Sequence, residues 1–258
     1  MKTFTDSRKR NAVLFMKEQG YDDKLGGKWT NGNSYDHILK IDEGHNQYDV
    51  ICKYNLLADI NPDLFSVPHR FAHHLTSSQV MCYNFFRPLI YDNGKPSSEL
   101  ISILGDKHIS IPNESICEFE ATNPIDNTSY DMAIGPVKFE IKFTENGFGK
   151  AKTDERHKVK FNNVYHGLIE KCKCLVNYPD VKIFFSYYQL FRNILHIDDK
   201  NKYAVFIFPK DNKQCRREFN EFLQFIKDDF RENIQVWHWE TLLEGKEGSD
   251  FYKKYLRQ

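Results

Sequence analysis

The stretch from Ser129 to Glu145 reads SYDMAIGPVKFEIKFTE, two apolar runs joined by Gly135-Pro136. The first run predicts a strand over Tyr130 to Ile134, and the second predicts a strand over Val137 to Thr144. A Gly-Pro pair between two such runs is typical of a tight turn. The stretch therefore predicts a β-hairpin.

Three polar residues of this hairpin are candidates for chemistry. Side chains two residues apart in a strand point to the same face, so Glu140 and Lys142 share one face while Ile141 points to the other. Asp131 lies on the partner strand, where it can be a neighbour across the sheet. We therefore expect two carboxylates and one amine to meet at one place.

The chemistry that suits this set is the hydrolysis of a phosphodiester bond. Mg²⁺ prefers oxygen ligands and keeps several waters, so Asp131, Glu140 and a substrate phosphate would suffice to bind it. The backbone carbonyl of Ile141 is a further candidate ligand, and Mn²⁺ is a candidate substitute. The ion would lower the pKa of a bound water, and Lys142 would offset the charge that grows at phosphorus. Glu-x-Lys alone also occurs on ordinary half-exposed strands, so the pattern needs support from its surroundings.

The segments around the hairpin alternate between helix and strand patterns. Thr76-Ser-Ser-Gln79 fits a capping box, with Thr76 as the N-cap of a helix over about 77–88. The remaining predicted elements are, in chain order, a strand over Ile116 to Ala121, the hairpin, a helix marked by Phe161 to Leu175, a mostly helical stretch over Ile183 to Ile197, a buried strand over Tyr203 to Phe208, a helix marked by Phe219 to Phe230, and a strand over Ile234 to Trp239. This order predicts an α/β fold with a mixed central sheet flanked by helices.

Residues 1–68 are expected to be irregular, with small strands or turns such as Tyr48 to Ile51. We interpret 1–68 as an N-terminal elaboration packed on a main domain of residues 69–258. The formal net charge is zero, with 36 basic and 36 acidic residues, so it neither indicates nor excludes a nucleic-acid partner. No apolar run is long enough for a membrane span or a secretory signal, so we expect a cytoplasmic protein with free cysteines and no membrane partner.

The motifs of this chain are more specific together than singly. They are His74-Leu-Thr-Ser-Ser-Gln79, Asn84-Phe-Phe-Arg-Pro-Leu89, Glu140-Ile-Lys-Phe-Thr-Glu145 with Phe148-Gly149, and Gln189-Leu-Phe-Arg192-Asn193. With the order of elements, they resemble the PD-(D/E)XK, or restriction-endonuclease-like, superfamily. Within it, the chain is similar to a group of restriction endonucleases with HLxSSQ, NFFxPL and EIKxTE motifs. The resemblance covers about residues 73–240, and Tyr130 stands where the superfamily's name has Pro.

This resemblance implies that Asp131 and Glu140 bind the metal and that Lys142 is catalytic. It also implies a Mg²⁺-dependent DNA endonuclease in restriction or phage defence, with DNA as its partner. Cutting of both strands would favour a homodimer, because a two-fold protein matches the two-fold backbone of DNA. Two other interpretations stay open, a non-catalytic DNA-binding or assembly module and a nuclease for RNA or branched DNA, because one fold hosts many substrates.

Further residues are candidates for the site, each with a structural role as the alternative. Glu120 could add a third carboxylate, and we prefer it to Glu118 on the same face, although both could face solvent. Gln79 could reach the site from its helix, although the capping box also explains it. Arg192, three residues after Gln189, could contact phosphate or tie a helix to the sheet. The basic residues Lys150, Lys152, Arg156 and Lys158 could hold DNA phosphates or form a solvated helix face.

Overall fold

The computed structural model describes residues 3–41, 44, 46–59, 61 and 68–257. The chain divides into two compact units. Unit 1 consists of Met1–Ser97 together with Trp239–Gln258, and unit 2 consists of Ser98–His238. The predicted domain organisation, an N-terminal elaboration over 1–68 and a main domain over 69–258, stays a prediction.

Unit 2 is built on a five-stranded sheet with the order β3-β4-β5-β6-β7. Its strands are β3 (Cys117–Thr122), β4 (Ser129–Ile134), β5 (Val137–Ile141), β6 (Tyr203–Phe208) and β7 (Ile234–His238). The strands β3, β4 and β5 pair antiparallel, whereas β5, β6 and β7 pair parallel. This mixed sheet, flanked by helices, confirms the predicted fold class, and Gly135-Pro136 forms the predicted turn between β4 and β5.

The interior strand β6 explains why the sheet needs cover on both faces. Its sequence, YAVFIF, is buried from Ala204 to Phe208, as expected for a strand between two parallel neighbours. One face of β6 contributes Phe206, whose ring lies 5.4 Å from that of Phe219 on α9 (Lys213–Phe222). On the other face of the sheet, the ring of Phe139 lies 5.6 Å from that of Trp237. Burial of such aromatic surface stabilises the sheet.

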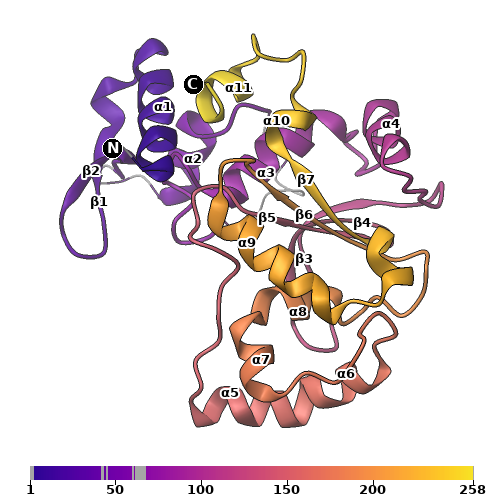
Figure 1. The fold of residues 1–258 in the computed structure, drawn as a ribbon. Coiled ribbons are helices and arrows are strands. Elements are labelled where there is room, and N and C mark those ends of the chain that lie inside the picture. Colours follow the sequence, from indigo (N-terminus) through magenta and orange to yellow (C-terminus); the bar gives the residue numbers. More distant parts are fainter. Residues whose placement is uncertain (1–2, 42–43, 45, 60, 62–67, 258) are drawn as a thin grey trace. The chain divides into compact units, whose positions relative to one another are not determined.

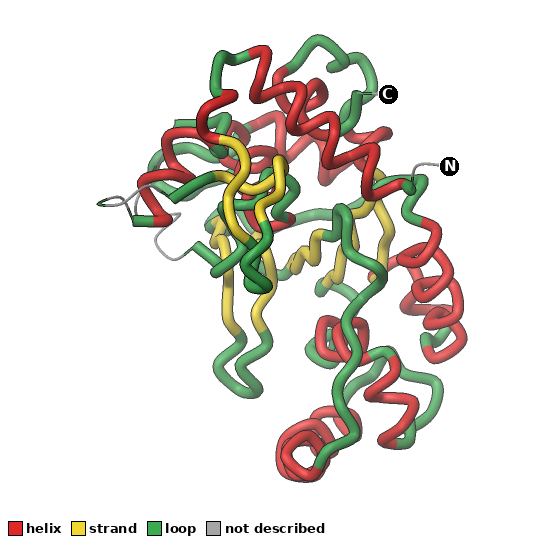
Figure 2. Tube along the Cα trace, turned by 90° about the vertical axis from the view of Figure 1, so that its left-hand side faces the viewer, coloured by secondary structure: helices red, strands yellow, loops and turns green. Residues whose placement is uncertain are grey.

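The helices between β5 and β6 form a group at one side of unit 2 (Figure 1). They are α5 (Glu155–Lys160), a π-helical turn (Phe161–Tyr165), α6 (His166–Lys171), α7 (Val181–Ser186) and α8 (Tyr188–Ile194). Figure 2, turned by 90°, shows them again as a red group. The π-helical turn, α6, α7 and α8 share one apolar core with β6 and α9. The predicted helices after the hairpin are therefore present, with different ends. The first helical stretch begins at Glu155 and ends at Lys171, so Leu175 lies outside it, in a β-bridge to Ile226, and the second is divided into α7 and α8.

Two local features of unit 2 differ from the prediction. A helix over Ser98–Asp106, α4, was not predicted. The helix marked by Phe219 to Phe230 begins at Lys213, where Asn212 caps it, and ends as α9 at Phe222. Short 3-10 turns over Leu223–Phe225 and Asp228–Asn233 then lead into β7. Amphipathic spacing therefore located this helix but placed both of its ends too late.

Unit 1 contains helices where the sequence predicts irregular structure. Its elements are α1 (Phe4–Glu18), the antiparallel strands β1 (Leu25–Lys28) and β2 (Ser34–Leu39), α2 (Gln47–Tyr54), α3 (Ser78–Phe86), α10 (Trp239–Leu242) and α11 (Asp250–Tyr255), with 3-10 turns over Asp22–Lys24 and Arg87–Leu89. The predicted strand or turn at Tyr48 to Ile51 is wrong, because these residues belong to α2. Asn46 caps that helix by accepting a hydrogen bond from the Asp49 N–H at 2.9 Å.

The capping box predicted at Thr76 is also wrong. Ser77 is the N-cap of α3, and its hydroxyl accepts from the Val80 N–H. The carboxamide of Gln79 accepts a 2.7 Å hydrogen bond from the His69 N–H, so it ties α3 to the preceding segment. Among the described residues, no helix combines the length and the apolar character needed to cross a bilayer.

Candidate metal-dependent nuclease site

The register of the hairpin places three carboxylates in one row across the sheet. Met132 pairs with Phe139, so the next pair along the hairpin is Asp131 with Glu140. Pairs of β3 with β4 on both sides of Glu120 place this residue opposite Asp131. Residues directly opposite each other in antiparallel strands share a face. The row Glu120, Asp131 and Glu140 therefore crosses β3, β4 and β5 at one end of the sheet.

Glu140 and Lys142 form a buried ion pair at this end. The Lys142 Nζ lies 2.7 Å from the Glu140 Oε1, and the side chains are 9% and 8% exposed. The strand β5 itself ends at Ile141, but the Lys142 N–H donates to the Ile207 carbonyl at 2.8 Å and keeps the residue in register with β6. The two-residue spacing therefore brings both side chains together as predicted.

Asp131 contacts the same end of β5 through its side chain. Its Oδ2 accepts a 2.6 Å hydrogen bond from the Ile141 N–H. Burial raises the pKa of the Asp131 carboxyl well above its usual range, and the negative charges of Glu140 and Glu120 raise it further. The Lys142 charge and the Ile141 N–H act in the opposite direction. Asp131 is therefore a carboxylate whose charge the protein alone compensates only in part.

Glu120 approaches this group from the edge strand. Its backbone has φ of 51°, the left-handed region that a residue with a side chain rarely adopts. Backbone strain of this kind is found disproportionately at functional sites. The contribution of its charge to the pKa of Asp131 places Glu120, rather than Glu118, beside the predicted set. Its catalytic role stays a prediction.

Lys142 is held as an ammonium ion. Burial alone would lower its pKa, but the charges of Glu140, Glu145 and Asp131 outweigh burial and raise the pKa above the usual value of lysine. A lysine in this state carries charge and donates hydrogen bonds, and it does not act as a base. Glu145, which lies in the Glu140–Glu145 motif but is not among the predicted site residues, therefore belongs to the electrostatics of the site.

The segment after Lys142 is fixed by α9. The Asn212 carboxamide donates to the carbonyls of Phe143 and Glu145 at 3.3 and 3.1 Å. The Glu218 carboxylate accepts a 2.7 Å hydrogen bond from the Phe148 N–H. Gly147 has φ of 97°, and a Cβ there would lie 2.4 Å from a Glu218 oxygen. Only glycine satisfies both the conformation and the close approach.

The helix α8 turns one polar face towards the hairpin. That face consists of Gln189, Arg192 and Asn193 at the helical spacing i, i+3 and i+4, and His196, in the turn after α8, continues it. Arg192 donates to the Thr128 hydroxyl at 3.2 Å and to the Asn127 carbonyl at 3.1 Å. The His196 ring lies 3.3 Å from the Asp126 carboxylate. Arg192 therefore ties α8 to the loop that precedes β4, not to a strand of the sheet, and phosphate contact by Arg192 stays a prediction.

Asn193 is the residue of this face that sequence reasoning missed. Its Nδ2 donates a 3.0 Å hydrogen bond to the Glu140 Oε2, and the residue is 5% exposed. Only its place in the Gln189-Leu-Phe-Arg192-Asn193 motif could have indicated it. Both oxygens of Glu140 are therefore oriented by the protein, one by Lys142 and the other by Asn193.

The donor set fits a cation that is bound by few protein ligands. Across residues 3–257, apart from the gaps in the description, no three His, Cys, Asp or Glu side chains are grouped as a preformed metal cluster. Mg²⁺ does not need such a cluster, because one or two carboxylates with waters and substrate phosphates suffice. The carboxylates Asp131 and Glu140, next to the Ile141 backbone, supply the oxygens that a hard cation prefers.

The other predicted residues lie outside this group. Gln79 belongs to unit 1 and is engaged by the His69 N–H, so its role at the site stays a prediction. The predicted DNA-binding residues that precede and open α5 all have exposed side chains: Lys150, Lys152, Arg156 and Lys158. The Lys158 Nζ lies 3.7 Å from a Glu155 oxygen. Exposure is compatible with DNA contact and equally with a solvated helix face.

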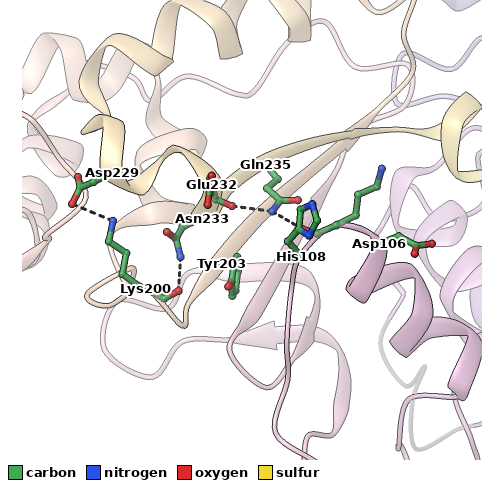
Figure 3. A pocket seen from close by; sticks show the side chains of 9 residues that line it. Asp106, His108, Lys200, Tyr203, Asp229, Glu232, Asn233 and Gln235 are labelled. Atoms are coloured by element: carbon green, nitrogen blue, oxygen red, sulfur yellow. Dashed lines mark hydrogen bonds and ion pairs between the residues drawn. The ribbon is translucent and has the colours of Figure 1, made fainter.

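A hollow of about 470 Å³ lies at the opposite end of the sheet (Figure 3). It is lined by Tyr203, which pairs with the first residue of β5, and by Asn233 and Gln235 at the start of β7. The Asn233 carboxamide donates to the Lys200 carbonyl at 2.8 Å. Because Asn233 holds a loop in this way, the polar lining needs no ligand to explain it. The hollow lies at the start of β5 and is therefore separate from the carboxylate row.

One of three comparisons with known proteins identifies a family for this chain. Comparisons with curated proteins and with solved structures give no match. A family described as "Restriction Endonuclease associating with ARP" matches residues 60–258, which include β3 to β7 and the whole carboxylate row. The chain therefore belongs to this restriction-endonuclease family.

Proposed function

We propose that the protein is a Mg²⁺-dependent endonuclease that hydrolyses phosphodiester bonds of DNA, in restriction or phage defence. The observation that carries the proposal is the meeting of Asp131, Glu140 and Lys142 at one end of a restriction-endonuclease-like sheet. Mn²⁺ is proposed as a substitute ion, the cytoplasm as the compartment, and a homodimer as the form that cuts both strands.

Each residue of the site has a distinct task in this reaction. Asp131, Glu140 and the Ile141 carbonyl would hold the ion, which supplies charge to the phosphate and acidifies water. The Lys142 ammonium would orient the attacking water and offset the negative charge that develops at phosphorus. The carboxamide of Asn193 keeps Glu140 from rotating. Low exposure around Glu140 and Lys142 strengthens these electrostatic interactions.

The decisive variant is Asp131→Asn. The new amide oxygen can still accept from the Ile141 N–H, but the charge that binds the ion is lost. Since changes beyond the direct ligands already cost about 10–100-fold, we expect cleavage of plasmid DNA in Mg²⁺ to fall by more than about 100-fold. We also expect the metal-free protein to become more stable, because a half-buried carboxylate next to Glu140 is removed.

The matched control is Asp199→Asn. Asp199 is exposed and also accepts a backbone hydrogen bond, from the Asn201 N–H at 2.7 Å. The Asp199→Asn variant should cleave DNA at the rate of the unmodified protein. Cleavage by Asp131→Asn at the rate of the unmodified protein, or equal cleavage in EDTA, would refute the proposal.

The same assay separates the alternatives. A non-catalytic DNA-binding module would bind DNA equally in Mg²⁺ and in EDTA and would never nick it. A nuclease of another substrate class would cut RNA or branched DNA and leave linear and plasmid DNA intact. The cleavage assay therefore includes RNA and branched DNA beside linear and plasmid DNA.

A further inference from the structure

Asn193 is the only member of the polar α8 face, as the structure describes it, with a hydrogen bond to a proposed ion-binding carboxylate. Its carboxamide is oriented unambiguously, because an oxygen turned towards the Glu140 Oε2 would be repelled. The opposite atom, Oδ1, is buried without a hydrogen-bond partner. Buried acceptors are normally satisfied by protein or by ordered water, so this one calls for an explanation.

We propose that Asn193 is a positioning residue of the metal site, acting on the ion through Glu140 and through water. Its Nδ2 fixes the Glu140 Oε2, which leaves the Oε1 with Lys142 and sets the plane of the carboxylate. Its Oδ1 accepts a hydrogen bond from a water of the hydrated ion. This inference rests on the proposed function, because it assigns Glu140 to a divalent cation.

Two features of the chain favour this role over simple packing. Mg²⁺ retains several waters, which are strong donors and need acceptors in a site with few protein ligands. The neighbours of Asn193 in α8, Phe191 and Ile194, are fully buried apolar residues, so an apolar side chain would suit position 193 if packing were its only purpose. Outer groups that orient a metal ligand typically contribute 10–100-fold to metal affinity.

The test uses Asn193→Leu, which keeps the branched arrangement of heavy atoms and removes both polar atoms. We expect the dissociation constant for Mn²⁺, measured without DNA by the electron paramagnetic resonance of the free ion, to rise by about 10–100-fold. DNA affinity in EDTA should stay unchanged. The matched control is Asn233→Ala, a buried asparagine of the same unit, 4% exposed, that holds loops at the other end of the sheet. It should lower the melting temperature and leave Mn²⁺ affinity intact.

A purely structural Asn193 would lower the melting temperature and leave Mn²⁺ affinity intact, as Asn233→Ala does, and this result would overturn the inference. A double-mutant cycle of Asn193→Leu and Glu140→Gln adds a readout that needs no activity. The quantity measured is the free energy of unfolding of the metal-free protein. Non-additive effects support the link, and additive effects refute it. If the unmodified protein binds Mn²⁺ but cuts no DNA, the nuclease proposal fails while the role of Asn193 stands.

Discussion

Lys142→Met is the change that most directly measures how the site is held together. The variant keeps an unbranched side chain and removes the ammonium that lies 2.7 Å from Glu140, with both side chains less than a tenth exposed. Removing one partner of a buried pair leaves an uncompensated charge and costs about 3–5 kcal/mol. For a chain of this size, such a loss corresponds to a fall in melting temperature of about 6–20 °C.

A divalent cation should partly reverse this loss. The cation brings positive charge to the same carboxylates, so Mg²⁺ should stabilise Lys142→Met more than it stabilises the unmodified protein. The measurement is urea unfolding in EDTA and in Mg²⁺, followed by circular dichroism. Cleavage should remain low in both conditions, since no other amine takes the place of the ammonium beside the phosphate.

Two further variants make the reasoning refutable. Lys202→Met removes a lysine paired at 2.6 Å with Asp198 on the surface, where such pairs contribute about 0–1 kcal/mol, so it should have little effect. Lys142→Met combined with Glu140→Gln should recover much of the lost stability, because neither charge then remains alone. A loss below about 1 kcal/mol for Lys142→Met would show that the pair is solvated and that the buried-pair argument is wrong.

Three other changes have expected outcomes. Gly147→Ala should lower the free energy of unfolding, measured in urea titrations, by about 1–3 kcal/mol, because a Cβ would clash with the Glu218 carboxylate on α9. Gly245→Ala should cost less, because Gly245 has a φ of 78° but open space around it. Burial lowers the pKa of Lys254 to about 7, below its value in the unfolded chain. The free energy of unfolding should therefore rise between about pH 7 and 10, by at most about 1.4 kcal/mol per pH unit. Lys254→Met should remove this slope. Reversal of charge at Lys152 and Arg156 should weaken DNA binding in EDTA and reduce its salt dependence by about one unit of slope per residue, and unchanged binding would leave them a solvated surface.

The core of the site could be predicted because its residues are close in sequence. Glu140 and Lys142 share a face through the two-residue period of a strand, and a tight turn returns Asp131 to the same end of the sheet. Asn193 could not be found in this way. It lies more than fifty residues further along, and only packing determines that its face of α8, rather than the opposite one, contacts the hairpin.

The helix α1 was missed for a related reason. Its buried positions include Arg8 and Asn11, so the apolar stripe that predicts a helix is interrupted by polar residues. The partners that satisfy them lie at the other end of the sequence. Arg8 donates to the carbonyls of Tyr255 and Leu256 at 3.2 and 3.1 Å, and Asn11 donates to that of Arg257. No local pattern can reveal such pairing.

The discontinuous make-up of unit 1 has a consequence for biosynthesis. Trp239–Gln258 leave the ribosome only after all of Ser98–His238 has been translated. The contiguous segment can therefore assemble its sheet while the chain is still growing, whereas α1 has to wait for its partner α11. Contacts that span almost the whole sequence also form slowly, because a long loop must first be closed. The nascent protein is thus expected to form the carboxylate row before α1 packs against α11.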